Sequence, residues 1–187
     1  MKKEDRDKIT EVLGVEPIII NSKFVSAQSR RRLYWTNLEG ITIPEDKGLV
    51  LQDVLESGKA DRDKSLCITS SYDGFTGCQD YFRHRYYGLS FGQIVLEDGA
   101  DPVEQRQAYK TYGKYSGVEV KGRLRELTAL ECERLQTLPD DYTKYGKFAD
   151  GKVKEIPKTT RYKIIGSAFT ADVITHLLTF IKDESDR

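Results

Sequence analysis

The sequence is poor in the residues that build disulfide frameworks and metal sites. It has only three cysteines and two histidines among 187 residues. Cys67, Cys78 and Cys132 are odd in number and show neither CxxC spacing nor a histidine-rich neighbourhood, so the pattern supports neither a disulfide framework nor a zinc site. We therefore interpret them as reduced thiols and expect no bound metal.

Long apolar runs and an excess of one charge are also absent. No window has the apolar length that crosses a bilayer, and the charged first residues lack the apolar core of a secretion signal, which predicts a cytoplasmic protein without membrane contact. Thirty basic and thirty acidic side chains cancel. This balance disfavours a protein that coats DNA nonspecifically, because such binding depends on neutralising phosphates. The length allows one ordinary core or two small ones.

The most distinctive stretch is residues 28–35, where three adjacent arginines stand between a short polar turn and the apolar run 33–35. Arginine presents a rigid fork of donors that suits phosphate oxygens and the acceptors on base edges. The stretch therefore indicates a nucleic-acid clamp. The same residues also fit a solvated basic turn before an edge strand.

The amino-terminal residues predict the edge of an α/β sheet. Apolar spacing predicts a short helix over residues 7–14. The β-branched run at 17–22 predicts a strand buried on both faces, with residues 33–36 as its neighbour. These elements are too few to form a complete α/β sheet.

From residue 37 to about residue 122 the chain reads as a loop-rich, mostly β module. Strands are predicted at 66–69 and 94–96, with a helical turn at 52–56.

Two helices are predicted towards the end of the chain. Thr128 and Glu131 form a capping box that begins the first, and this helix runs to about Leu138. The second spans residues 170–181. Its apolar stripe, like the strand at 18–20, is expected to be underburied in an isolated chain and to favour self-association or a partner subunit. The stripe consists of Val173, Ile174, Leu177 and Leu178.

Residues 25–37, 125–140 and 166–174, in this order, resemble motifs VIII, IX and X in the carboxyl-terminal half of bacterial or phage DNA cytosine-5 methyltransferases. The resemblance implies an incomplete α/β fold. Residues 1–38 and 160–187 would be the edge of a Rossmann-like methyltransferase sheet that uses S-adenosyl-L-methionine. Residues 39–159 would be a small target-recognition domain that includes the motif IX helix.

The family's catalytic signatures do not occur in this sequence. It contains no Pro-Cys dipeptide for the nucleophile, no Glu-Asn-Val triplet for the acid and no early glycine-rich turn for the cofactor. Carbon 5 of cytosine becomes nucleophilic only after a thiolate adds to carbon 6 and an acid assists at the ring nitrogen. We therefore expect no reaction from this chain alone. Cys132 is a possible substitute nucleophile, but its place among leucines in a capped helix favours a structural thiol.

The resemblance also implies roles for particular residues. Arg32 would donate to the flipped cytosine and to the glutamate of a partner, Arg30 would hold phosphate or the catalytic loop, and Gln28 would fix the turn. The turn before the last helix, Gly166, Ser167 and Ala168, would lie at the methionine end of the cofactor. The expected motif IX scaffold consists of Arg125, Thr128, Glu131, Arg134 and Gln136. The expected DNA-reading residues are Tyr72, Arg83, Arg85 and Tyr86.

These inferences predict the DNA-recognition and target-cytosine-binding part of a DNA cytosine-5 methyltransferase. It would act on double-stranded DNA with an amino-terminal half, and S-adenosyl-L-methionine would bind only in that complex. The alternatives are a non-catalytic DNA-binding or regulatory homologue and an α+β domain unrelated to DNA.

Overall fold

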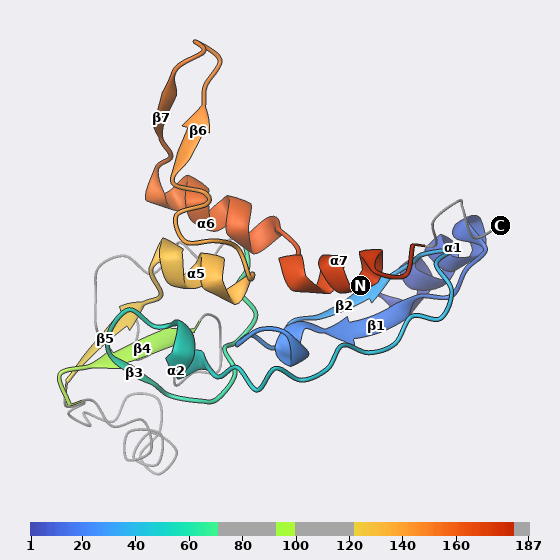
Figure 1. Ribbon diagram of the computed structural model, residues 1–187, viewed down its shortest axis with the longest axis horizontal. Helices are drawn as coiled ribbons and strands as arrows, with labels where there is room; N and C mark the ends of the chain where they lie inside the picture. Colours follow the sequence, from blue (N-terminus) through green and yellow to red (C-terminus); the bar gives the residue numbers. More distant parts are fainter. Residues whose placement is uncertain (71–92, 100–121, 182–187) are drawn as a thin grey trace.

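The computed structural model describes residues 1–70, 93–99 and 122–181 (Figure 1). The amino-terminal helix α1 spans Lys3–Leu13 and ends at Gly14, which adopts the left-handed conformation expected of a glycine stop. Strand β1 (Ile18–Asn21) and strand β2 (Arg31–Tyr34) pair antiparallel, and the short helix η1 (Ser22–Phe24) begins the loop between them. The hairpin places the arginine cluster at the start of β2.

The predicted burial of the first strand on both faces is wrong. Ile20 is buried, but Ile19 is 41% exposed, because β1 pairs only with β2 among the described strands and the hairpin is covered on one face. That cover is α7 (Ala171–Leu178), whose Val173 and Leu177 are buried against Ile20. The expectation of underburial therefore holds for Ile19 and Leu178, and it is wrong for Ile20, Val173 and Leu177.

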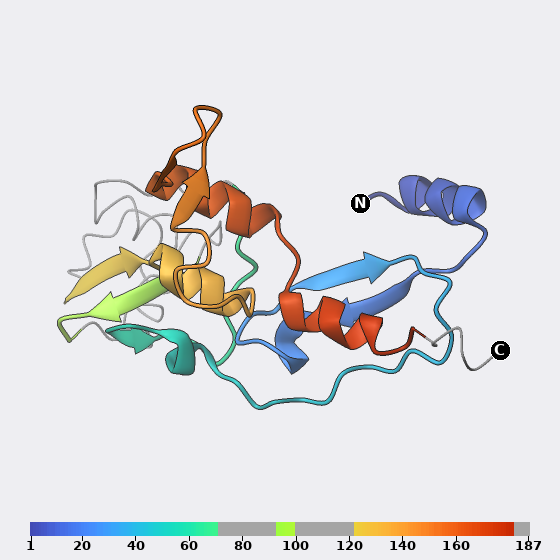
Figure 2. The same ribbon diagram turned by 45° about the horizontal axis from the view of Figure 1, so that its top comes forward.

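A second group of elements, which lies beside the β1–β2 hairpin and α7, forms the larger core (Figure 2). Strands β3 (Lys59–Ala60), β4 (Ile94–Glu97) and β5 (Arg123–Glu126) make an antiparallel sheet with β4 in the middle. Helices α2 (Leu51–Val54), α5 (Ala129–Leu135) and α6 (Lys158–Ser167) pack with it. The strand predicted at 94–96 is confirmed. The one predicted at 66–69 is wrong, since this extended segment joins no described sheet.

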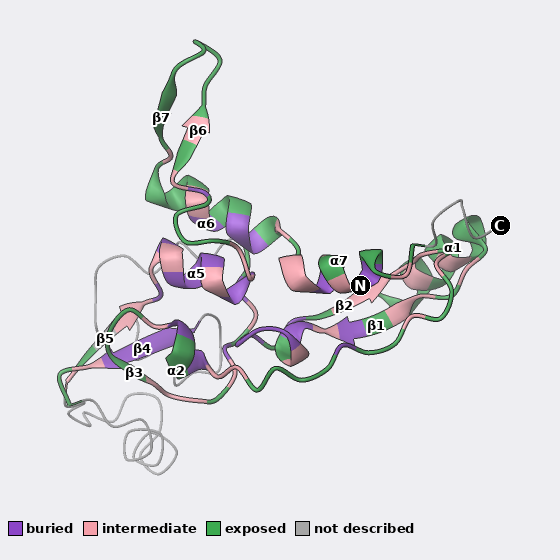
Figure 3. Cartoon of the chain, in the orientation of Figure 1, coloured by how far each residue is buried: buried purple, intermediate pink, exposed green. Residues whose placement is uncertain are grey.

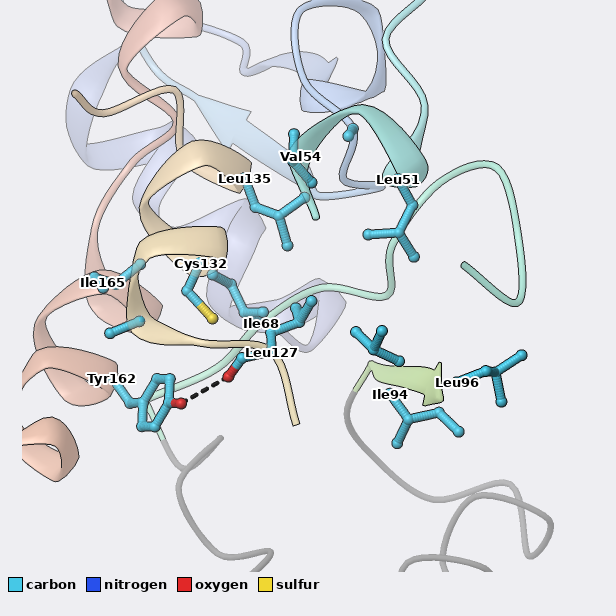
Figure 4. Close-up of a cluster of buried hydrophobic side chains, with 13 residues drawn as sticks. Leu51, Val54, Ile68, Ile94, Leu96, Leu127, Cys132, Leu135, Tyr162 and Ile165 are labelled. Carbon is cyan, nitrogen blue, oxygen red and sulfur yellow. Dashed lines mark hydrogen bonds between the residues drawn. The ribbon is translucent and has the colours of Figure 1, made fainter. Parts of the chain in front are cut away.

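Figure 4 shows the buried side chains of this core. Leu127, Leu135 and Ile165 are fully buried, and Tyr162 donates its hydroxyl to the Leu127 carbonyl at 2.7 Å. A buried phenol needs such an acceptor. The predicted domain boundaries at residues 38 and 160 stay a prediction. Tyr162 and Ile165 of α6 lie in the larger core.

The last hairpin stands apart from both cores. Strand β6 (Tyr145–Lys147) pairs antiparallel with β7 (Val153–Glu155) between α5 and α6. Figure 3 shows that it projects from the body and that most of its surface is exposed.

Candidate functional site

The loop between β1 and β2 is held closed by its own side chains. The Asn21 side chain accepts from the backbone N–H of Lys23 at 3.1 Å and from that of Arg30 at 3.0 Å. The backbone N–H of Ser22 donates to the Arg30 carbonyl at 3.1 Å. These bonds fix the direction in which the arginine cluster leaves the loop.

Gln28 is a fully buried link between the loop, helix α5 and the segment after residue 65. Its amide nitrogen donates to the Leu135 carbonyl at 3.2 Å, and its amide oxygen accepts from the Ile68 N–H at 2.9 Å. Ser26 donates to the same Leu135 carbonyl at 2.6 Å. Buried backbone groups need such partners, so Gln28 satisfies two segments at once.

Arg30 points into the protein. Its guanidinium donates to the carbonyls of Ile68, Gly166 and Ala168 at 2.8, 3.1 and 2.9 Å, and to Cys67 Sγ at 3.3 Å. Burial lowers the pKa of Arg30 from its ordinary value, but an arginine remains cationic. Its donors bind acceptors of this chain, which makes Arg30 a residue that positions the loop.

Arg32 is the more accessible of the two arginines. It is half-buried, and its guanidinium donates to the Arg31 carbonyl at 2.9 Å and to Cys67 Sγ at 3.4 Å. Three of its five N–H donors therefore bond to none of the described residues and remain for a ligand. Arg31 is exposed between them.

A second buried chain of hydrogen bonds joins the hairpin to the last two helices. The Ser22 and Thr170 hydroxyls lie 2.8 Å apart, and Thr170 donates to the Gln136 side-chain oxygen at 2.9 Å. The Gln136 amide donates to the Ile165 carbonyl at 2.9 Å. Ser22 and Thr170 were not predicted as site residues, and no spacing in the sequence reveals their contact.

Residues 14–183 match the family model of the C-5 cytosine-specific DNA methylases. The chain belongs to this family. It resembles the solved structure of the Entamoeba histolytica methyltransferase EhMeth with 14% identity and a TM-score of 0.55, covering 93% of this chain and 56% of that one. It also resembles the S. pombe Dnmt2 methyltransferase with 17% identity and a TM-score of 0.50, covering 94% and 60%. The methylase-family chain thus spans less than two thirds of either structure.

The buried hydrogen bonds join the three segments that resemble motifs of the methylase family. Gln28 and Arg30 lie in the segment that resembles motif VIII, Gln136 in motif IX and Gly166 in motif X. In this family member, segments more than a hundred residues apart are joined through one polar junction. We call the linked residues Gln28, Arg30, Gln136 and Thr170 the motif junction.

The motif IX residues of the methylase-family chain form a second cluster. Arg125 makes two bonds to the fully buried Glu131, each at 2.8 Å, and donates to Glu97 at 2.9 Å. Thr128 and Glu131 form the capping box at the start of α5, which confirms that prediction. Arg134 donates through Nε and Nη2 to the two carboxylate oxygens of Asp140, at 2.8 and 2.6 Å.

The motif X turn differs from its predicted position. Gly166 and Ser167 are the last residues of α6 and Ala168 caps its end, so they do not directly precede the next helix. A Cβ on Gly166 would lie 2.2 Å from the Thr69 carbonyl carbon, so the backbone of Thr69 fills the space next to Gly166 and leaves no room for a ligand there. The family generally uses S-adenosyl-L-methionine. Of the three predicted cofactor residues, only Ser167 is exposed, and their contact with the cofactor stays a prediction.

Several predictions lie outside the described residues. Tyr72, Arg83, Arg85 and Tyr86 fall between residues 71 and 92. Among the described residues, no group of three or more His, Cys, Asp or Glu side chains is arranged to hold a metal ion. In the same part of the chain, no helix is both long and apolar enough to span a membrane.

Proposed function

We propose that this chain is the DNA-recognition and target-cytosine-binding part of a DNA cytosine-5 methyltransferase. Its substrate would be double-stranded DNA with one cytosine turned out of the helix. Residues 1–38 and 160–187 would belong to the cofactor-binding large domain and residues 39–159 to the target-recognition domain. An amino-terminal half would supply the nucleophilic thiolate, the acid and most of the pocket for S-adenosyl-L-methionine.

The motif junction is the observation that supports this proposal most. Its four side chains orient the loop that ends in Arg32, and all four are buried. An isolated basic turn does not need four buried polar side chains to hold it in place. Their desolvation is offset only because each is hydrogen-bonded, and the result is a rigid base for one half-exposed guanidinium.

The chemistry assigns this chain binding and orientation. An amino-terminal half would hold the thiolate that adds to carbon 6 of cytosine, and S-adenosyl-L-methionine, when bound, would be the source of the methyl group for carbon 5. Arg32 would donate to the cytosine oxygen, where negative charge grows as the thiolate adds. The exposed Ser167 would face the methionine end of the cofactor. The sequence has no Pro-Cys or Glu-Asn-Val, so it has no group for bond formation.

The direct test combines this chain with an amino-terminal half of a family member and measures methyl transfer to duplex DNA. Arg32→Ala is expected to reduce kcat by about 10²-fold or more, as removal of a donor to a developing oxyanion does. Arg31→Ala is the matched control, because Arg31 is the neighbour of Arg32 and its side chain is exposed. Equal activity of the two variants would contradict the role of Arg32.

A non-catalytic DNA-binding homologue is the second candidate, favoured by the missing Pro-Cys dipeptide. It predicts DNA affinity that falls in Arg32→Ala and no methyl transfer with any amino-terminal half.

A further inference from the structure

The β6–β7 hairpin leaves the body of the protein and is covered by little of it (Figures 1 and 3). Five of its six strand residues are exposed, and only Gly146 is half-buried. An isolated two-stranded hairpin gains little stability from burial and is marginal in water. Its presence here is therefore not explained by a contribution to either core.

The root of this hairpin is nevertheless firmly fixed. The Glu133 carboxylate is fully buried, accepts from the N–H of Thr143 at 2.7 Å and also accepts from the Thr143 hydroxyl. Arg161 donates to the same carboxylate oxygen at 3.0 Å. Across the hairpin, the N–H of Ile156 donates to the Lys144 carbonyl at 2.8 Å. The hairpin is thus an arm held at its base.

The arm and the helix that follows it are rich in positive charge. Between residues 142 and 163 there are seven lysine or arginine side chains and two acidic ones, whereas the whole chain is neutral. Lys147 and Lys152 are exposed on either side of the turn, and neither forms an ion pair with a described residue. Three other lysines form ion pairs at the surface, namely Lys144, Lys154 and Lys158. Their side chains are 34 to 62% exposed, and ion pairs this exposed are weak.

Aromatic rings support the lysines of the arm. The Lys154 ammonium lies 5.4 Å from the centre of the Phe148 ring, and the Lys144 ammonium lies 5.8 Å from that of Tyr145. Both rings are themselves exposed, at 41% and 58%. Cation–π contacts of this kind hold a flexible lysine over the ring without removing its charge from solvent.

We infer that the β6–β7 arm is a second DNA contact that binds the phosphate backbone of the duplex. This inference rests on the proposed function, which supplies the duplex. A fixed arm with unpaired lysines at its tip is complementary to a polyanion, and lysine contacts phosphate as a point charge without reading sequence. The arm would add affinity, while the expected DNA-reading residues between 72 and 86 of the same target-recognition domain would add specificity.

The test compares two double variants of the full chain in binding to a short fluorescein-labelled DNA duplex. Lys147→Gln with Lys152→Gln removes the two charges from the tip of the arm. Lys3→Gln with Lys8→Gln removes two exposed charges from α1 and is the matched control. Each phosphate contact contributes about 0.9 to the slope of log affinity against log salt, so the arm variant should lose about 2 from this slope. Duplexes of different sequence should lose affinity to the same extent.

The outcomes separate this inference from the function on which it rests. If the unmodified chain binds the duplex and both double variants keep its slope, the arm is no DNA contact, and an acidic protein surface becomes the ligand to examine. If the unmodified chain does not bind duplex DNA at all, the proposed function fails and the arm inference fails with it. Urea unfolding of both variants should give the midpoint of the unmodified chain, because the replaced side chains are exposed.

Discussion

At Gly166, two segments of the chain come so close that a side chain has no room. A Cβ there would lie 2.2 Å from both the carbonyl carbon and the oxygen of Thr69. Gly166→Ala should therefore lower the free energy of unfolding by about 1–3 kcal/mol, the usual cost of overpacking. Urea unfolding measures this, with the exposed Ser167→Ala as a control that should change it by less than about 0.5 kcal/mol. Equal midpoints would show that the contact relaxes without cost.

The cysteines differ in their expected reactivity with iodoacetamide. Burial raises the pKa of the Cys132 thiol well above its ordinary value, and the neighbouring carboxylates, Glu131 first, add to this shift. A higher pKa leaves less thiolate, so the folded protein should leave Cys132 unmodified near neutral pH. Cys67 is only partly buried and should react. In a Cys78→Ser background, mass spectrometry should find one modified thiol in the folded chain and two in urea; rapid modification of Cys132 in the folded chain would contradict its burial.

At the level of single residues, the sequence indicated which residues matter better than what they contact. The motifs were enough to predict the importance of Gln28, Arg30 and Gln136. That Arg30 turns inward could not be predicted, because its acceptors are carbonyls of Ile68, Gly166 and Ala168, which any residue type provides.

Among the elements, helix α5 depends on one buried carboxylate. Glu131 accepts two bonds from Arg125 and one each from the N–H groups of Glu56 and Thr128. Glu131→Ala leaves the Arg125 guanidinium without this partner and should cost about 3–5 kcal/mol, as breaking a buried pair does. Urea unfolding measures the loss, with the exposed Glu155→Ala as control. A loss of less than about 1 kcal/mol would mean that the pair is not important for stability.

The sheet of β4 and β5 should lose stability in acid. Desolvation raises the pKa of Glu97, but the hydrogen bonds and charges of Arg125 and Arg123 outweigh it, so the net pKa is below the ordinary value. A lowered pKa gives stability that is present above the unfolded-state value and is lost as pH falls through the folded-state value. The fall in urea midpoint from neutral to acidic pH should therefore be smaller in Glu97→Gln than in the unmodified chain. An identical fall would contradict this ion pair.

Elements with strong local signals were predictable and those defined by distant contacts were not. The capping box predicts the start of α5, and the β-branched run predicts β1. Helix α6 was missed because its residues show little apolar periodicity, and its place depends on Tyr162 and Ile165 entering the larger core. The apolar residues at 66–69 predict a strand, whereas the Ile68 N–H of this segment donates to Gln28 from another part of the chain.

For the whole molecule, the order of the three motifs was enough to predict the family, which the match over residues 14–183 now shows. The sequence could not predict how the two cores are joined, since the motif junction consists of contacts between residues far apart in the chain. Exposed Ile19 on β1 and Leu178 on α7 leave apolar surface at the hairpin. We expect an amino-terminal half to cover it.

We propose that this chain binds DNA and the target cytosine while a partner supplies the groups that form bonds. The most direct measurement is the transfer of labelled methyl groups from S-adenosyl-L-methionine to carbon 5 of cytosine in duplex DNA, by this chain, by an amino-terminal half and by the two together. We expect methyl transfer only in the mixture. Transfer by this chain alone, or none in the mixture although the chain binds DNA, would contradict it.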